Sequence, residues 1–241
     1  MRKESATQME LMLRSAKERL YAMDVAEIQR NSGIRIEEDA MVIESMGQEY
    51  RLSLDKLDFD RALEMWHHLT LLQYLFTADG TPLRHRWIAL PDMPGGLSRG
   101  YGFDKDISLM FERNFNGMTS EEFKRLACRI GSVESGHRAD ASIVVQYAPR
   151  FPILVNFWES DDEFPCSGKV FVDTDAHHYL TIEAAGGACS AVIQRLIELK
   201  KNETSGCESR TRFRLKLCCF VYRCVLVWGS VYQCNIIKSM G

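Results

Sequence analysis

The sequence predicts an α+β fold: a single domain of mainly antiparallel sheet packed with helices, followed by a C-terminal tail of atypical composition. Helical and strand-like hydrophobic periods arrive in blocks along the 241 residues, in the order helix, hairpin, helices, strands and helix. A doubly wound parallel sheet would alternate them regularly. Apolar residues make up 46% of the chain and charged residues 26%, so a full core can form without metal or disulfide bonds.

The first half of the chain contains two predicted helices and a hairpin between them. Apolar residues at spacings of three and four predict a helix over residues 5–30, with Gly33 as its stop. The alternating runs on either side of Met46-Gly47 predict a β-hairpin. Residues 60–78 are apolar around much of a helical circumference, so we expect a central, buried helix with Trp66 on its core-facing side.

The second half is predicted to contain three helices and three strands. Pro91-Asp-Met-Pro-Gly-Gly96 predicts an irregular loop, because two prolines and two glycines interrupt regular structure. Thr119 and Glu122 form the sequence pattern of a capping box at a helix start. The helices are expected near residues 105–116, 120–130 and 181–201, and the strands at 141–146, 153–158 and 169–173.

The end of the chain differs in composition from the rest. From Ser209 onward there are six basic residues and no acidic one, so the preceding part has 24 basic and 33 acidic residues, a net charge of −9. Five of the eight cysteines also lie near the end: Cys207, Cys218, Cys219, Cys224 and Cys234. We therefore expect an α+β domain at residues 5–202 and a cysteine-rich, basic and apolar tail at 203–241. The abrupt change favours a non-native or disordered tail.

The net charge and the composition of the two ends of the chain indicate which partners and which cellular compartment to expect. The net charge of −3 argues against general nucleic-acid binding, which needs a basic field. The start of the chain lacks the apolar core of a secretory signal, so we expect a cytoplasmic protein with reduced thiols. Membrane association is not expected unless the tail is native and inserts, because Arg223 near its centre would cost about 2.5 kcal/mol or more.

The densest polar stretch runs from residue 158 to residue 183. Its candidate binding residues are Trp158, Glu159, Asp161, Asp162, Glu163, His177 and His178. Desolvation of Asp161, Asp162 or Glu163 would raise a carboxyl pKa and permit acid–base chemistry, whereas a plain exposed turn is the commoner outcome for such residues. We expect Phe164-Pro165 to anchor this turn in the core.

Four residues of the same stretch are candidate metal ligands: Asp173, Asp175, His177 and His178. Carboxylate oxygens and imidazoles suit a divalent metal, although these side chains equally fit the capping of a strand end and a helix start. If the flanking strands pair as a hairpin, residues 159–163 lie at its connecting end and Asp173 at the other. One hairpin therefore does not place both sets in a single site.

His67 and His68 lie side by side in the predicted central helix. Neighbouring residues project about 100° apart on a helix, so the two imidazoles are poorly placed to hold one metal ion. We expect one of them to be a hydrogen-bonded core histidine and the other to lie at the periphery of the core.

Residues from about 60 to 200 resemble an uncharacterised family, domain-of-unknown-function family 3786. The resemblance rests on Trp87-Ile-Ala-Leu-Pro-Asp-Met-Pro-Gly-Gly96, on Phe157-Trp-Glu-Ser-Asp-Asp-Glu-Phe-Pro165 and on His177-His-Tyr-Leu180. It implies occurrence in anaerobes, where some members are joined to an iron–sulfur segment. Asp175-Ala-His177-His-Tyr-Leu180 is also similar to the Asp-x-His-x-x-Gly pattern of corrinoid proteins, except that leucine replaces the glycine.

The resemblance implies a cytosolic binding or accessory module in anaerobic redox or corrinoid-linked metabolism. The lack of a recognisable catalytic constellation favours such a module over an enzyme. Its candidate cofactors are a divalent metal or a corrinoid, since the chain has no iron–sulfur motif. Two alternatives stay open. One is a metal-dependent enzyme that uses the four candidate metal ligands, and the other is a structural interaction domain.

Overall fold

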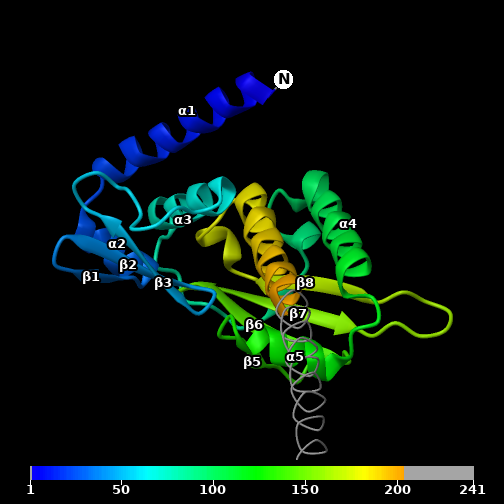
Figure 1. The fold of residues 1–241 in the computed structure, drawn as a ribbon. Helices are drawn as coiled ribbons and strands as arrows, with labels where there is room; N and C mark the ends of the chain where they lie inside the picture. The colour runs from blue at the N-terminus through cyan, green and yellow to red at the C-terminus, as the bar shows by residue number, and fades with distance from the viewer. Residues whose placement is uncertain (1, 204–241) are drawn as a thin grey trace, which may run out of the picture. The chain divides into compact units, whose positions relative to one another are not determined.

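The computed structural model describes residues 2–203 (Figure 1). The chain separates into two compact units, Met1–Ile197 and Glu198–Gly241, and the fold below is that of the first. Apart from residue 203, the predicted tail lies outside the described residues. The boundaries 5–202 and 203–241 therefore stay a prediction. Among residues 2–203, none of the helices combines the length and apolar character needed to cross a bilayer.

The N-terminal segment forms two helices, where the sequence predicted one over residues 5–30. Helix α1 covers Arg2–Tyr21 and helix α2 covers Val25–Ser32. Between them Asp24 is extended, and its side chain accepts a hydrogen bond from the Ala26 amide. This N-cap starts a new helix, which explains the break. Gly33 ends α2 in the left-handed conformation, as predicted.

The predicted hairpin is confirmed as part of a three-stranded antiparallel sheet. Its strands are β1 (Arg35–Glu37), β2 (Ala40–Ser45) and β3 (Gln48–Ser53). The turn residues Met46 and Gly47 both have positive φ, 51° and 70°, as a tight two-residue hairpin requires. The turn packs against the rest of the unit, since the Met46 amide donates to the Gln146 carbonyl.

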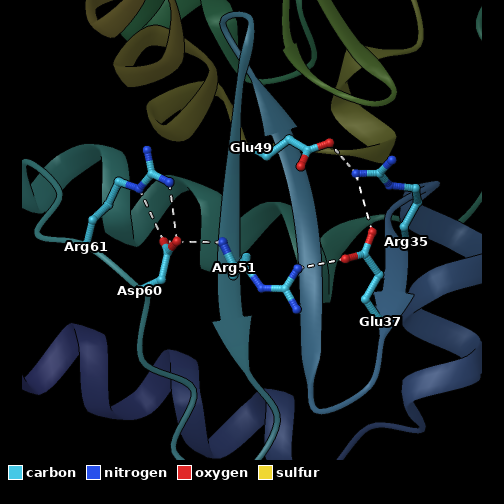
Figure 2. A network of polar contacts seen from close by, with 6 residues as sticks. All are labelled: Arg35, Glu37, Glu49, Arg51, Asp60 and Arg61. Atoms are coloured by element: carbon cyan, nitrogen blue, oxygen red, sulfur yellow. Dashed lines mark hydrogen bonds and ion pairs between the residues drawn. The ribbon is translucent and has the colours of Figure 1, made fainter.

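One face of this small sheet has alternating charges (Figure 2). Arg35 pairs with both Glu37 and Glu49, and Arg51 pairs with Glu37 at 2.7 Å. The side chains are 39% to 58% exposed, so each pair is screened by water and adds little to stability. The charges therefore define the solvated side of the sheet rather than a binding site.

Helix α3 is shorter than predicted and covers Met65–Thr77. It begins at residue 65 because the Glu64 carboxylate caps it, accepting hydrogen bonds from the amides of Trp66 and His67. The body of the helix is buried, as expected. Trp66 lies in the first turn and is 56% exposed, so its predicted place on the core-facing side is wrong.

The predicted loop at residues 91–96 is a compact helical corner. A 3₁₀ turn, η1, covers Leu90–Asp92, and helix α4 begins directly after it and covers Gly96–Phe115. Gly96 and Gly100 both face the backbone of η1. Helix α4 therefore starts nine residues earlier than the apolar period indicated.

A five-stranded sheet forms the second half of the unit, and every pairing in it is antiparallel. The strand order is β4-β8-β7-β6-β5. The strands are β4 (Trp87–Ile88), β5 (Val133–Glu134), β6 (Ala141–Ala148), β7 (Phe151–Trp158) and β8 (Ser167–Asp173). A 3₁₀ turn, η2, covers Ala176–His178, and residues 182–203 are helical. Two antiparallel sheets packed with helices confirm the predicted α+β class.

Aromatic stacking joins α4, helix α5 (Ser120–Cys128) and the sheet. Phe123 of α5 stacks on Phe157 of β7 with ring centroids 4.6 Å apart, and Phe111 of α4 lies 6.1 Å from Phe157. Phe111 also covers Gly168 of β8, where an added Cβ would lie 2.3 Å from the ring. All three rings are buried, so this cluster fixes one face of the sheet against the helices.

The capping box predicted for α5 is present, and its removal gives a first testable result. The Thr119 hydroxyl accepts from the Glu122 amide, and the Glu122 carboxylate accepts from the Thr119 amide. Thr119→Ala should lower the free energy of unfolding by about 1 kcal/mol, because it leaves the Glu122 amide without its acceptor. Urea denaturation measures the change. Thr119→Ser keeps the hydroxyl and should stay close to the parent protein, and equal losses in both variants would contradict the capping explanation.

Candidate functional site

The acidic turn lies at the connecting end of the β7–β8 hairpin. Trp158 pairs with Ser167 at that end, while Ile153 pairs with Val172 near the other end, where β8 finishes at Asp173. The hairpin expected from the sequence therefore forms. It separates the acidic candidates at 159–163 from the Asp and His candidates at 173–178, and the two sets are described separately below.

Two carboxylates of the turn are engaged with backbone amides. Glu159 accepts a hydrogen bond of 2.6 Å from the amide of Ser120, the first residue of α5, and hydrogen bonding to Ser120 lowers the Glu159 pKa. Asp161 accepts from the amides of Glu163 and Phe164, and these bonds lower the Asp161 pKa. Lowered pKa values keep both groups ionised, the opposite of what a general acid needs.

The turn is closed by its own hydrogen bonds rather than by burial of Phe164. Phe164 is 66% exposed, so the prediction that it anchors the turn in the core is wrong. The anchor is the next buried side chain, Cys166, whose amide donates to Asn116 and whose thiol donates to the Phe111 carbonyl. Asp162 and Glu163 are exposed beside it.

Two aspartates are buried where β8 ends. Asp173 is 1% exposed and Asp175 is 5% exposed. One oxygen of Asp173 accepts from the amides of Arg84 and Asp175. The guanidinium of Arg84 lies 2.9 Å from Asp175 Oδ2. Neither Asp173 Oδ2 nor Asp175 Oδ2 receives a hydrogen bond of good geometry from the described residues. The pair is thus neutralised mainly by Arg84, a side chain that is 65% exposed.

The four candidate metal ligands do not share a centre. In residues 2–203, no three His, Cys, Asp or Glu side chains are grouped so that they could hold a metal ion. The two aspartates face the 79–86 segment, where their contacts are with Arg84. His177 is exposed, and its ring centroid lies 4.2 Å from that of His178.

His178 has a partner that its local sequence does not indicate. Its Nδ1 lies 2.6 Å from Asp79 Oδ2 and 3.2 Å from the Thr81 hydroxyl. A carboxylate only accepts, so Nδ1 carries the proton, and Nε2 of the neutral ring is left as an acceptor. The side chain of His178 is 32% exposed. The arrangement orients one imidazole through Nδ1, and no hydrogen bond to its Nε2 is present among the described residues.

The Asp79 end of this pair is firmly held. Burial raises the pKa of Asp79, but hydrogen bonds from Thr81 and His178 outweigh it and hold that pKa at about 2. The Thr81 carbonyl accepts from the Tyr179 hydroxyl, and the Gly80 carbonyl accepts from Arg150. The 79–81 segment is thereby fixed on both sides, so Asp79 can hold the imidazole ring in one orientation.

The adjacent histidines of α3 occupy the two environments expected from the sequence. His67 is buried, and its Nδ1 lies 3.0 Å from the Tyr147 hydroxyl. His68 is half-buried and packs edge-on against the Phe59 ring at 5.0 Å. His67 belongs to the core rather than to a binding site.

Asp79, Thr81 and Arg84 are site residues that the sequence did not reveal. Asp79-Gly-Thr-Pro was a turn pattern only, and nothing local pairs it with a histidine 99 positions later. The basic run Arg84-His85-Arg86 beside that turn was the one available signal. The role of this run follows from the pairing of β4 with the end of β8, which brings Arg84 beside Asp173 and Asp175.

Comparison with known proteins identifies the family of the chain. Searches of curated proteins and of solved structures found no match. A family model described as "Domain of unknown function (DUF3786)" matches residues 24–195, which include both sheets and the Asp79–His178 pair. The chain belongs to this family.

Proposed function

We propose that this chain is a binding module that presents the imidazole of His178 to a metal-containing cofactor. The observation that carries the proposal is the 2.6 Å contact between His178 Nδ1 and Asp79. Histidines that bind metals commonly donate their second ring nitrogen to a carboxylate, which fixes the tautomer and raises the basicity of the free nitrogen. The His178 side chain is 32% exposed, and its Nε2 receives no hydrogen bond from the described residues, which supports its use for a ligand.

The donor set favours a cofactor over a free ion. One imidazole binds a free divalent ion weakly, and among residues 2–203 no three donor side chains come together around a point. A metal held by this one imidazole needs most of its other coordination positions filled by the cofactor itself. A corrinoid fits this requirement, because its ring supplies four nitrogens. Such a group would supply redox or one-carbon chemistry when bound. This fits an accessory role in anaerobic, corrinoid-linked metabolism, in the cytoplasm.

A spectroscopic titration tests the proposal. Diaquocobinamide has no nucleotide base of its own, so an imidazole that replaces its water shifts its visible absorption. The parent protein should produce this shift. His178→Ala should abolish it, and Asp79→Asn should weaken binding about 10- to 100-fold, because the ring loses its orienting carboxylate. Absence of any shift with the parent protein would overturn the proposal.

Two further histidine variants sharpen the result. His85→Asn is the matched control, because His85 is exposed in the same segment at a positive φ of 55° that asparagine tolerates. It should leave the titration unchanged. His177→Ala separates the two neighbouring rings. A loss with His177→Ala as large as that with His178→Ala would contradict the assignment to the Asp79-held imidazole.

A metal-dependent enzyme is the second candidate. The observation that favours it is the buried oxygen Asp173 Oδ2, which receives no hydrogen bond from the described residues, near Asp175 Oδ2, which is ion-paired with Arg84 at 2.9 Å. With Mn²⁺ as the probe, calorimetric binding that disappears in Asp173→Asn and persists in His178→Ala would favour this candidate over the cofactor module. A purely structural interaction domain is supported only by exposed apolar side chains such as Trp66.

A further inference from the structure

Arg150 lies between the two segments that carry the Asp79–His178 pair. It belongs to the turn that joins β6 to β7. Its guanidinium donates a hydrogen bond of 3.2 Å to the carbonyl of Gly80, the residue directly after Asp79. It also lies beside the hydroxyl of Tyr179, the residue directly after His178. Burial raises the pKa of that hydroxyl, and the interaction with Arg150 opposes the rise. One side chain from a distant turn therefore reaches both segments.

The two segments are also joined to each other by hydrogen bonds. The Tyr179 hydroxyl donates to the Thr81 carbonyl. The Thr81 amide in turn donates to the Asp79 carboxylate at 2.9 Å. Arg150 thus interacts with both sides of this connection: the segment that presents the carboxylate and the tyrosine that holds this segment in place.

Arg150 is itself fixed by the elements around it. Its backbone amide donates to the Tyr74 hydroxyl at 2.9 Å, and the Tyr74 ring stacks on the Tyr179 ring with centroids 6.0 Å apart. The Tyr74 hydroxyl donates to the Ser32 carbonyl at the end of α2. At Gly33, which ends that helix, an added Cβ would lie 3.2 Å from Arg150 Nε. Helices α2 and α3 therefore hold the half-buried arginine in one place.

The guanidinium is directed at neutral groups rather than at a carboxylate. In the part of the chain that the structure describes, no Asp or Glu lies within ion-pair distance of Arg150. A guanidinium has five N–H donors in a fixed fork, so it can serve a carbonyl and a hydroxyl at once, whereas an ammonium is a point charge. This geometry suits the orientation of two neighbouring segments, not the neutralisation of a charge.

We propose that Arg150 is the positioning residue of the His178 site. It holds the 79–81 segment against Tyr179, which keeps the Asp79 carboxylate on Nδ1 and the ring proton on that nitrogen. Without a fixed acceptor, the proton of a neutral imidazole distributes over both nitrogens. The consequence for a bound cofactor rests on the proposed function, whereas the effect on the ring does not.

Heteronuclear NMR of the histidine rings in the full chain, without cofactor, tests the positioning directly. At about pH 8, where a free imidazole is neutral, His178 of the parent protein should carry its proton on Nδ1. Arg150→Ala should shift His178 to a mixture of both tautomers. Arg150→Lys should restore the parent state only in part, because one ammonium does not replace the fork. In the cobinamide titration, Arg150→Ala should bind about tenfold more weakly.

A double variant shows whether Arg150 acts through Asp79. Asp79→Ala removes the acceptor of the ring proton. Adding Arg150→Ala to it should then cause no further change in the tautomer or in the affinity for cobinamide. A further loss as large as the one that Arg150→Ala causes in the parent protein would contradict the proposal, because it would reveal an effect that does not pass through the carboxylate.

Arg86→Ala is the matched control, since Arg86 is exposed nearby in the chain and its side chain makes no ion pair or hydrogen bond with the described residues. It should leave the ring and the titration unchanged. If Arg150→Ala folds, as judged by urea denaturation, and His178 keeps its tautomer, the proposal is wrong. Arg150→Lys carries the same comparison if the alanine variant does not fold. Should the parent protein fail to bind cobinamide, the proposed function falls, and the NMR comparison still decides the role of Arg150.

Discussion

Gly100→Ala should destabilise the protein severely, by about 3 kcal/mol or more, although alanine is normally the better helix residue. A Cβ at position 100 would lie 2.5 Å from both Cα and N of Pro91. These are backbone atoms of η1, which no side-chain rotation can move aside. The whole η1 turn would have to shift away from α4, and with it the buried side chains of Leu90 and Pro91.

The same helix provides a matched control two residues away. At Gly102 an added Cβ would meet nothing within 4 Å. Gly102→Ala should therefore raise the free energy of unfolding by up to about 1 kcal/mol, through helix propensity alone. Urea denaturation measures both variants. If the dependence of the unfolding free energy on urea concentration is unchanged, the difference between the unfolding midpoints gives the difference in stability. If the two alanine variants prove equally stable, the close approach of η1 to α4 is not a feature of the folded protein.

This corner also shows what the sequence could and could not predict. Two prolines and two glycines in residues 91–96 predicted an irregular loop because each breaks a regular period. What they build is a close contact between backbones, in which Gly96 and Gly100 face η1 one helical turn apart. Periodicity reports which residues are apolar. It does not report where two backbones approach, so the start of α4 was missed.

Sequence patterns predicted the structure correctly where the interacting residues lie close together in the chain. The Met46-Gly47 turn and the Thr119 capping box follow from residues a few positions apart, and both are present. The β7–β8 pairing also followed, because it joins neighbouring strands. This predicted hairpin correctly placed the acidic turn and Asp173 at opposite ends of β8.

The candidate site depended on long-range contacts, which local patterns do not contain. His178 was selected for its dense polar neighbourhood, but its carboxylate partner is Asp79 rather than the nearby Asp175. The acidic turn was a candidate because of its charge, yet the carboxylates of Glu159 and Asp161 accept hydrogen bonds from backbone amides. One sequence cannot distinguish a carboxylate that closes a turn from one that meets a ligand, since both are exposed acidic residues.

The stability of the protein should fall by about 3 kcal/mol between pH 7 and pH 4 because of His67 alone. Burial, together with the charge of His68, lowers the His67 pKa from 6.5 to about 4. Between those two values the unfolded chain binds a proton at this site and the folded protein does not. Lowering the pH therefore favours the unfolded state, and the contribution present above pH 6.5 is lost as the pH falls to 4.

The surroundings of His67 explain why its ring resists protonation. Its Nδ1 already faces the Tyr147 hydroxyl, and its Nε2 is buried with no hydrogen-bond partner among the described residues. A protonated ring would bury a second N–H with no acceptor. The Tyr50 ring packs edge-on against the His67 ring at 5.4 Å, and the Glu64 carboxylate accepts a hydrogen bond from the His67 amide. Neither residue therefore supplies an acceptor for a second ring N–H.

Urea denaturation across this pH range, with a non-titrating variant, isolates the effect. His67→Gln keeps a polar group near Tyr147 and should lose about 3 kcal/mol less than the parent protein between pH 7 and pH 4. The pKa of His68 is also lowered by burial, so its own contribution, of the same sign, remains in both proteins. His137→Gln, at an exposed histidine, should follow the parent curve. If the His67→Gln and parent curves run parallel over this range, the imidazole of His67 is not held neutral by the core.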